Sequence, residues 1–66
     1  MMTGIFYDPA RRRLHVVAGP PHPDWLFVTH DTGARPHQCR RIMRDWLPPE
    51  ELCRVDWSGV GRAPAA

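Results

Sequence analysis

The clearest periodic pattern in the chain lies in residues 36–47, where apolar and basic positions recur with the spacing of an α-helix. At 100° per residue, five apolar side chains fall within an arc of roughly 140°, and four basic side chains lie within roughly 100° of one another on the opposite side. We therefore predict a helix over 36–47 with one buried stripe and one basic stripe. The apolar set is Cys39, Ile42, Met43, Trp46 and Leu47, and the basic set is His37, Arg40, Arg41 and Arg44.

A β-hairpin is predicted near the N-terminal end. Residues 5–7 are strand formers and lead into residues 8–11, where an aspartate first and a proline second suit a type I turn. Residues 13–18 then place apolar side chains at every second position, which is the two-residue period of a sheet. The two segments therefore read as antiparallel strands joined by a tight turn.

The remainder of the chain supplies a third strand, the helix and a last strand. Three prolines in residues 19–23 stop the second strand, because proline lacks the N–H group of a sheet ladder. Residues 25–29 are strand formers, residues 50–52 add one helical turn after two prolines, and residues 53–57 alternate like a strand. We predict one small two-layer α+β domain over residues 1–66, with element order β-β-β-α-β. An antiparallel sheet of three to four strands carries one helix on one face, with an ordered core over about 3–57 and a flexible tail over 58–66.

The register of the predicted sheet determines what each face contains. If consecutive strands are antiparallel neighbours, the helix covers the face formed by Ile5, Tyr7, Leu14, Val16, Trp25 and Phe27. The second face then holds Phe6, Arg13, His15, Val17, Leu26, Val28 and His30. This face is more apolar than a solvated sheet surface usually is. Because twofold homodimers are the commonest soluble oligomers, we expect a second copy to cover it. The expected interface residues are Phe6, Val17, Leu26 and Val28.

Length and composition narrow the function classes. A chain of 66 residues buries only about 60% of its unfolded surface, so a deep catalytic cleft is hard to build. The chain has nine arginines and no lysine, which fits a GC-rich or heat-adapted source. A chain without lysine cannot contain the phosphate-binding loop of P-loop nucleotide hydrolases. A net charge of +2 does not by itself demand a polyanionic partner.

The N-terminal residues and the cysteines favour a cytoplasmic protein. No basic segment followed by an apolar run opens the chain, and no stretch approaches the roughly 20 apolar residues of a membrane span. Two cysteines without an export signal are more often reduced than bridged. Cys39 and Cys53 are expected about 12 Å apart, a helix length, which exceeds the roughly 7 Å limit for a disulfide. We expect both to be small buried apolar residues.

No catalytic, cofactor-binding or metal-ligating set is evident. His37 and Cys39 point about 200° apart on a helix, so they cannot share one ion. His15 and His30 could lie diagonally on adjacent strands, roughly 7 to 8 Å apart at the backbone, but the paired motifs typical of zinc sites are missing. We therefore expect no enzyme activity, no bound metal and no cofactor.

The arginines carry the remaining functional hypothesis. Two clusters could hold phosphates with bidentate hydrogen bonds: Arg11, Arg12 and Arg13 at the hairpin, and His37, Arg40, Arg41 and Arg44 on the helix. The alternative is a solvated helix face neutralised by Asp45, Glu50 and Glu51, beside a charged hairpin tip that prevents aggregation. Our first hypothesis is a homodimeric interaction module, with a possible further protein partner and no membrane. The second is a nucleic-acid-binding module that uses both arginine clusters.

Overall fold

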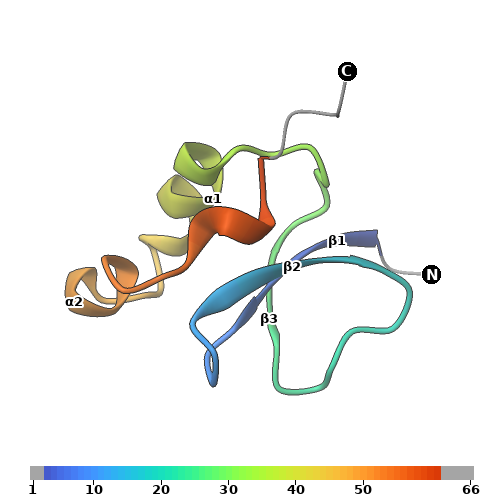
Figure 1. Cartoon of the computed structure of the whole chain (residues 1–66), viewed down its shortest axis with the longest axis horizontal. Helices are drawn as coiled ribbons and strands as arrows, with labels where there is room; N and C mark the ends of the chain where they lie inside the picture. Colours follow the sequence, from blue (N-terminus) through green and yellow to red (C-terminus); the bar gives the residue numbers. More distant parts are fainter. Residues whose placement is uncertain (1–2, 62–66) are drawn as a thin grey trace.

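A computed structural model describes residues 3–61 of the chain and contains a three-stranded antiparallel sheet with one main helix. This confirms the small α+β fold (Figure 1). The elements are strands β1 (Thr3–Asp8), β2 (Arg13–Ala18) and β3 (Leu26–Thr29), helices α1 (Pro36–Met43) and α2 (Pro49–Leu52), and the 3-10 helix η1 (Trp57–Gly59). Within residues 3–61, no helix has the length and apolar character to cross a bilayer.

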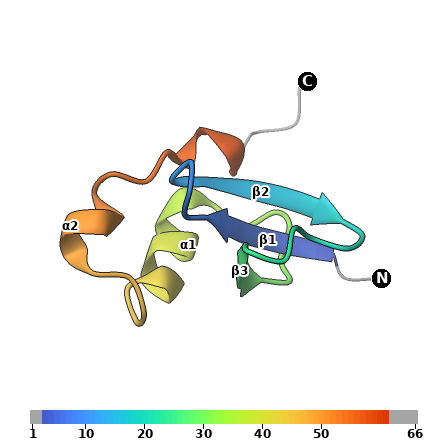
Figure 2. The same ribbon diagram turned by 90° about the horizontal axis from the view of Figure 1, so that it is seen from below.

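Strand β1 occupies the centre of the sheet, whose order is β2-β1-β3 (Figure 2). The β1–β2 hairpin is confirmed, with Asp8 paired to Arg13 across the connection formed by residues 9–12. Arg12 in this connection has φ 52°, a left-handed conformation that occurs in hairpin loops of this length. The expected side-by-side pairing of β2 with β3 is wrong, because β3 pairs with the other edge of β1.

The side chains of β3 face opposite ways from those expected. Phe6 pairs with Phe27, but Ile5 pairs with Thr29, so Val28 is an extra residue that forms a β-bulge. Val28 consequently packs in the core on the helix side, and Phe27 lies beside Phe6 on the second face. The faces predicted for the side chains of β1 and β2 agree with their register. In β3 the register differs by one residue, so its side chains lie on the opposite faces from those predicted.

Helix α1 is shorter than the sequence pattern indicates. It ends at Met43, after which the Trp46 and Leu47 amides both donate to the Met43 carbonyl and form a turn. Cys39 and Met43 are fully buried, while Ile42 is 37% exposed and Trp46 is 40% exposed. The buried stripe is therefore narrower than the apolar stripe in the sequence.

The C-terminal segment packs against the hairpin without forming a fourth strand. Its only strand-like contact in the described part of the chain is a bridge in which the Asp56 amide donates to the Arg12 carbonyl at 2.7 Å. The Asp56 carboxylate then accepts a hydrogen bond from the Ser58 amide at 3.0 Å and caps η1, which lowers the pKa of Asp56. Val60 is 5% exposed and belongs to the core, so packing continues beyond residue 57. The remainder of the expected tail, residues 62–66, lies outside the described residues.

The core lies between the sheet and the helical segments. It consists of Ile5, Tyr7, Leu14, Val28, Ala34, Cys39, Met43, Leu52, Val55 and Val60. Both cysteines are free, as expected, but only Cys39 is buried. Cys53 is exposed, and its thiol donates to the Glu50 carbonyl at 3.3 Å. Burial, reinforced by the charge of Asp31, raises the pKa of the Cys39 thiol.

Truncation of Met43 tests the orientation of α1. Met43→Ala should lower the free energy of unfolding by about 2–5 kcal/mol, because it leaves a cavity in the core. The matched control is the neighbouring Ile42→Ala, which should cost about 1 kcal/mol or less because Ile42 is 37% exposed. Urea unfolding followed by tryptophan fluorescence measures both values. Equal losses would contradict the inward position of Met43.

Thiol titration tests the difference between the cysteines. The folded protein should react with one equivalent of DTNB at neutral pH through Cys53, and with two equivalents in denaturant. Cys53→Ser should leave the folded protein unreactive while its denatured form still titrates one thiol. Rapid reaction of two thiols in the folded state would show that Cys39 is accessible.

Candidate functional site

Three basic side chains of α1 and that of Arg44, the residue after the helix, surround one open hollow. His37, Arg40, Arg41 and Arg44 line a cavity of about 350 Å³, and all four residues are exposed. The spacings of three and four residues place them on one side of the helix. Their orientation follows from the burial of Cys39 and Met43, which direct the opposite side of α1 into the core. The structure thus brings together the complete helical set expected from the sequence, which we term the α1 basic surface.

The arginines of the α1 basic surface have no acidic partner among residues 3–61. Glu51, one of the acids that would neutralise them under the alternative hypothesis, instead binds the Arg12 Nε at 3.1 Å. Asp45 and Glu50 form no ion pair with an arginine in this part of the chain. The guanidinium groups are therefore available to an external anion.

The chemistry of this surface suits phosphate. A guanidinium group presents five N–H donors in a planar fork that matches two phosphate oxygens. The residues that line the hollow supply no carboxylate and no thiol. Cationic side chains in the last turn of α1 also stabilise the helix by complementing its dipole. That stabilisation does not consume their hydrogen-bond donors, so the surface can perform both roles.

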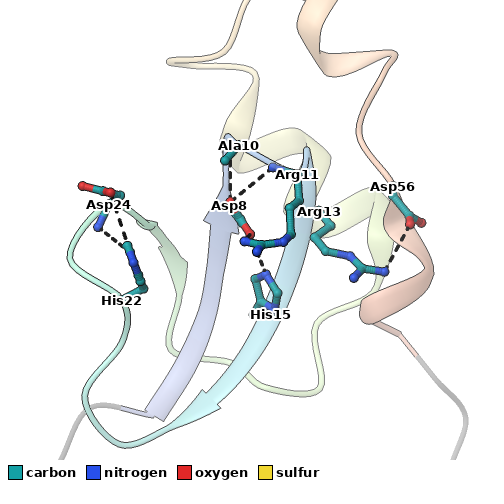
Figure 3. Close-up of polar contacts among 8 residues, drawn as sticks. All are labelled: Asp8, Ala10, Arg11, Arg13, His15, His22, Asp24 and Asp56. Atoms are coloured by element: carbon teal, nitrogen blue, oxygen red, sulfur yellow. Dashed lines mark hydrogen bonds and ion pairs between the residues drawn. The ribbon is translucent and has the colours of Figure 1, made fainter.

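The hairpin arginines are placed differently, since each is paired within the chain. Arg11 Nη1 lies 3.2 Å from Asp8 Oδ2, and Arg12 pairs with Glu51. Arg13 Nη2 lies 3.8 Å from Asp56 Oδ2 (Figure 3). Arg12 and Arg13 thereby connect the hairpin to α2 and to the segment before η1. Anion binding by the hairpin arginines stays a prediction, but it would compete with these ion pairs.

The four residues of the expected dimer interface lie in different parts of the fold. Phe6 is 3% exposed and Val28 is 5% exposed, so neither offers appreciable contact area to a second copy. Val17 is half-buried, and Leu26 is 45% exposed. Leu26 pairs with Tyr7, a core residue, and therefore lies on the helix side of the sheet at its edge. Homodimerisation stays a prediction, but the four residues do not form one surface.

A polar cluster that sequence reasoning missed lies at the end of β1. The Asp8 side chain is almost fully buried, and its residue is 1% exposed. Its carboxylate accepts hydrogen bonds from the backbone amides of Ala10 and Arg11 at 3.1 and 3.3 Å. It also accepts from Arg11 Nη1 at 3.2 Å and from His15 Nε2 at 3.1 Å (Figure 3). These donors satisfy the buried charge.

The hydrogen bonds to Asp8 determine its ionisation. Burial by itself raises the pKa of the carboxyl group, but hydrogen bonds from His15 and Arg11 outweigh this effect and hold the pKa below its ordinary value. The His15 ring, fixed by Asp8, stacks on the Trp25 indole with centroids 4.0 Å apart and planes 2° apart. The alternation along β1 and β2 places Asp8 and His15 on one face, but Trp25 depends on the register of β3.

The histidines form no metal site within residues 3–61, where no group of three or more His, Cys, Asp or Glu side chains converges. His15 is hydrogen-bonded to Asp8, and the His30 ring contacts the Phe27 ring at a centroid distance of 4.6 Å. The two histidines that were considered together in the sequence therefore have separate neighbours.

Acid titration of stability tests the Asp8 cluster. Because the pKa of folded Asp8 is lowered, its stabilising contribution is present above the unfolded pKa of about 3.9 and is lost as pH falls through the folded pKa. Asp8→Asn should melt at a lower temperature at pH 7 and lose less stability between about pH 6 and pH 3. Thermal melts across this range measure the effect. Asp24→Asn, at an exposed carboxylate, is the control and should behave like the wild type; a wild-type pH profile in Asp8→Asn would contradict the assignment.

No family model, curated protein or solved structure matches the chain.

Proposed function

We propose that the protein is a small interaction module that binds nucleic acid through the α1 basic surface. The observation that carries this proposal is the division of the arginines. Those of the hairpin are paired within the chain, whereas Arg40, Arg41 and Arg44 line one hollow and have no acidic partner in the described residues. Exposed unpaired guanidinium groups on one helix face provide the electrostatic contact that nucleic-acid binding requires.

The length of the α1 basic surface favours a polymer over a single small anion. His37 and Arg44 are separated by two helical turns, about 10 Å at 1.5 Å per residue. One phosphate group is too small to contact both ends of this row. Successive phosphates of a nucleic-acid backbone can each meet a different guanidinium group. Binding through the nucleic-acid backbone requires no catalytic residue.

Self-association has less structural support than nucleic-acid binding. Phe6 and Val28, half of the interface expected from the sequence, contribute to packing within one chain. We retain the cytoplasm as the proposed compartment, because free thiols such as the exposed Cys53 persist in a reducing environment.

Salt-dependent binding tests the proposed function. The affinity of the protein for a fluorescein-labelled oligonucleotide, measured by anisotropy, should fall steeply between about 50 and 200 mM salt. The double substitution Arg40→Ala with Arg44→Ala should reduce the slope of log K against log salt by about 1.4 to 1.8, or about 0.7 to 0.9 per lost phosphate contact. The reduction reflects two fewer released counterions.

Arg54→Ala provides the matched control. Arg54 is exposed and unpaired within residues 3–61, but it does not line the hollow. Its removal changes the net charge and should leave the slope close to that of the wild type. Undetectable binding at low salt, or equal effects per arginine in the control and the double variant, would refute nucleic-acid binding through α1.

A further inference from the structure

The face of the sheet opposite α1 carries a group of aromatic and imidazole rings. Phe27 projects from β3 and His15 projects from β2 onto this face, and Trp25, just before β3, stacks on His15. His30 lies against Phe27. We term these four residues, Trp25, Phe27, His15 and His30, the ring surface. None of them was assigned to the α1 basic surface.

The rings are held by contacts within the chain. His15 and Trp25 are parallel at 4.0 Å, and Phe27 meets the edge of Phe6 at 5.5 Å with planes 69° apart. Gly4 permits the close approach of the β3 backbone, since a Cβ there would lie 2.5 Å from the Thr29 carbonyl oxygen, and Phe27 Cε1 would lie at a contact distance of 3.4 Å. The Asp8 carboxylate fixes His15. The ring surface is therefore a preorganised platform.

Part of the platform remains exposed to solvent. Phe27 is 42% exposed, the His15 side chain is 27% exposed, Trp25 is half-buried and His30 is exposed. Phe6 beneath them is buried, so it contributes support and no contact area. An exposed phenylalanine beside an indole and two imidazoles is an aromatic surface on which a planar ligand can stack.

The charges around the ring surface favour contact with bases, with limited contact to phosphates. The Asp8 carboxylate is buried, whereas its partner Arg11 is 67% exposed, so the solvent meets a cationic group at that end. Arg13 is paired with Asp56, and the exposed Asp24 lies 3.9 Å from His22 in the preceding loop. The Arg11 and Arg13 guanidinium groups are each paired with a carboxylate but remain partly exposed, so this face can meet an anionic strand and depends mainly on its rings for affinity.

We infer, on the basis of the proposed nucleic-acid binding, that the ring surface stacks unpaired bases and that the preferred ligand is a single strand. The α1 basic surface contacts phosphates. Because single strands and duplexes both carry phosphates, this electrostatic contact alone does not distinguish them. Bases stacked within a duplex cannot lie on an external ring, whereas unpaired bases can stack on aromatic side chains. The ring surface thus supplies the selectivity that the α1 basic surface lacks.

A single strand fits this face better than a second copy of the chain. The exposed part of the ring surface consists of one phenylalanine with tryptophan and histidine rings, which retain polar N–H groups at their edges. The exposed aliphatic residue of β3, Leu26, lies toward the other side of the sheet. Of the aliphatic residues that the dimer hypothesis required, this face keeps the half-buried Val17, so a dimer through the ring surface would have little aliphatic contact area.

The first experiment uses the unmodified protein. Its affinity is measured at fixed low salt for a single-stranded oligonucleotide, the duplex of the same sequence, and an abasic oligomer with the same number of phosphates. Loss of base stacking is worth about 1–3 kcal/mol per base, so the abasic oligomer should bind at least about fivefold more weakly. The single strand should also bind more tightly than the duplex. Equal affinity for the single strand and the abasic oligomer would overturn base stacking.

The second experiment uses adjacent residues of β3. Phe27→Leu retains an apolar side chain over Phe6 but removes the ring, and should weaken single-strand binding at least about fivefold without changing the salt slope. Leu26→Ala is the matched control, because Leu26 is 45% exposed and Phe27 is 42% exposed. It should bind like the wild type. Thermal melts confirm that both variants are folded at the assay temperature.

The outcomes separate the two proposals. Binding that is absent for every oligomer at low salt refutes the proposed function and the inference together. Salt-dependent binding with no preference for the single strand, and unchanged in Phe27→Leu, overturns only the ring surface. A doubled molar mass in light scattering that Phe27→Leu abolishes, with oligonucleotide affinity unchanged, assigns this face to a second copy and also overturns base stacking.

Discussion

The rest of the sheet depends on the hydrogen bonds that the buried Asp8 carboxylate accepts. It satisfies two amides of the hairpin connection, binds Arg11 and holds the His15 ring, on which Trp25 stacks. One charge thereby links the turn, strand β2 and the loop that leads to β3. In a chain of this size the core alone supplies little stability, so a fully satisfied buried charge has a large structural role.

Local sequence periods predicted the local elements well. The β1–β2 hairpin and the basic side of α1 depend on residues a few positions apart, and both are present as expected. The faces of β3 were wrong because strand order and the bulge at Val28 arise from contacts distant in sequence. For the same reason, Trp25 and Val60 could not be placed from the pattern, since their neighbours come from other elements.

The difference in ion pairing among the arginines was also beyond local reasoning. In the sequence, Arg12 and Arg13 resemble Arg40 and Arg41, because each pair is adjacent and basic. The fold distinguishes them by bringing Glu51 and Asp56 to the hairpin, whereas Arg40 and Arg41 form no ion pair within the described residues. The candidate site was therefore visible as a set of residues, but its availability to a ligand became evident only from the positions of the carboxylates.

The central position of β1 also determines how the sheet can assemble. The β1–β2 hairpin closes through residues 9–12, and such local contacts form quickly. Pairing of Tyr7 with Leu26 requires closure of a much longer, proline-containing loop. During that interval one side of β1 presents unsatisfied backbone groups, which are prone to pair with another chain. The short strand β3 therefore acts late in folding as the cover that protects the central strand from aggregation.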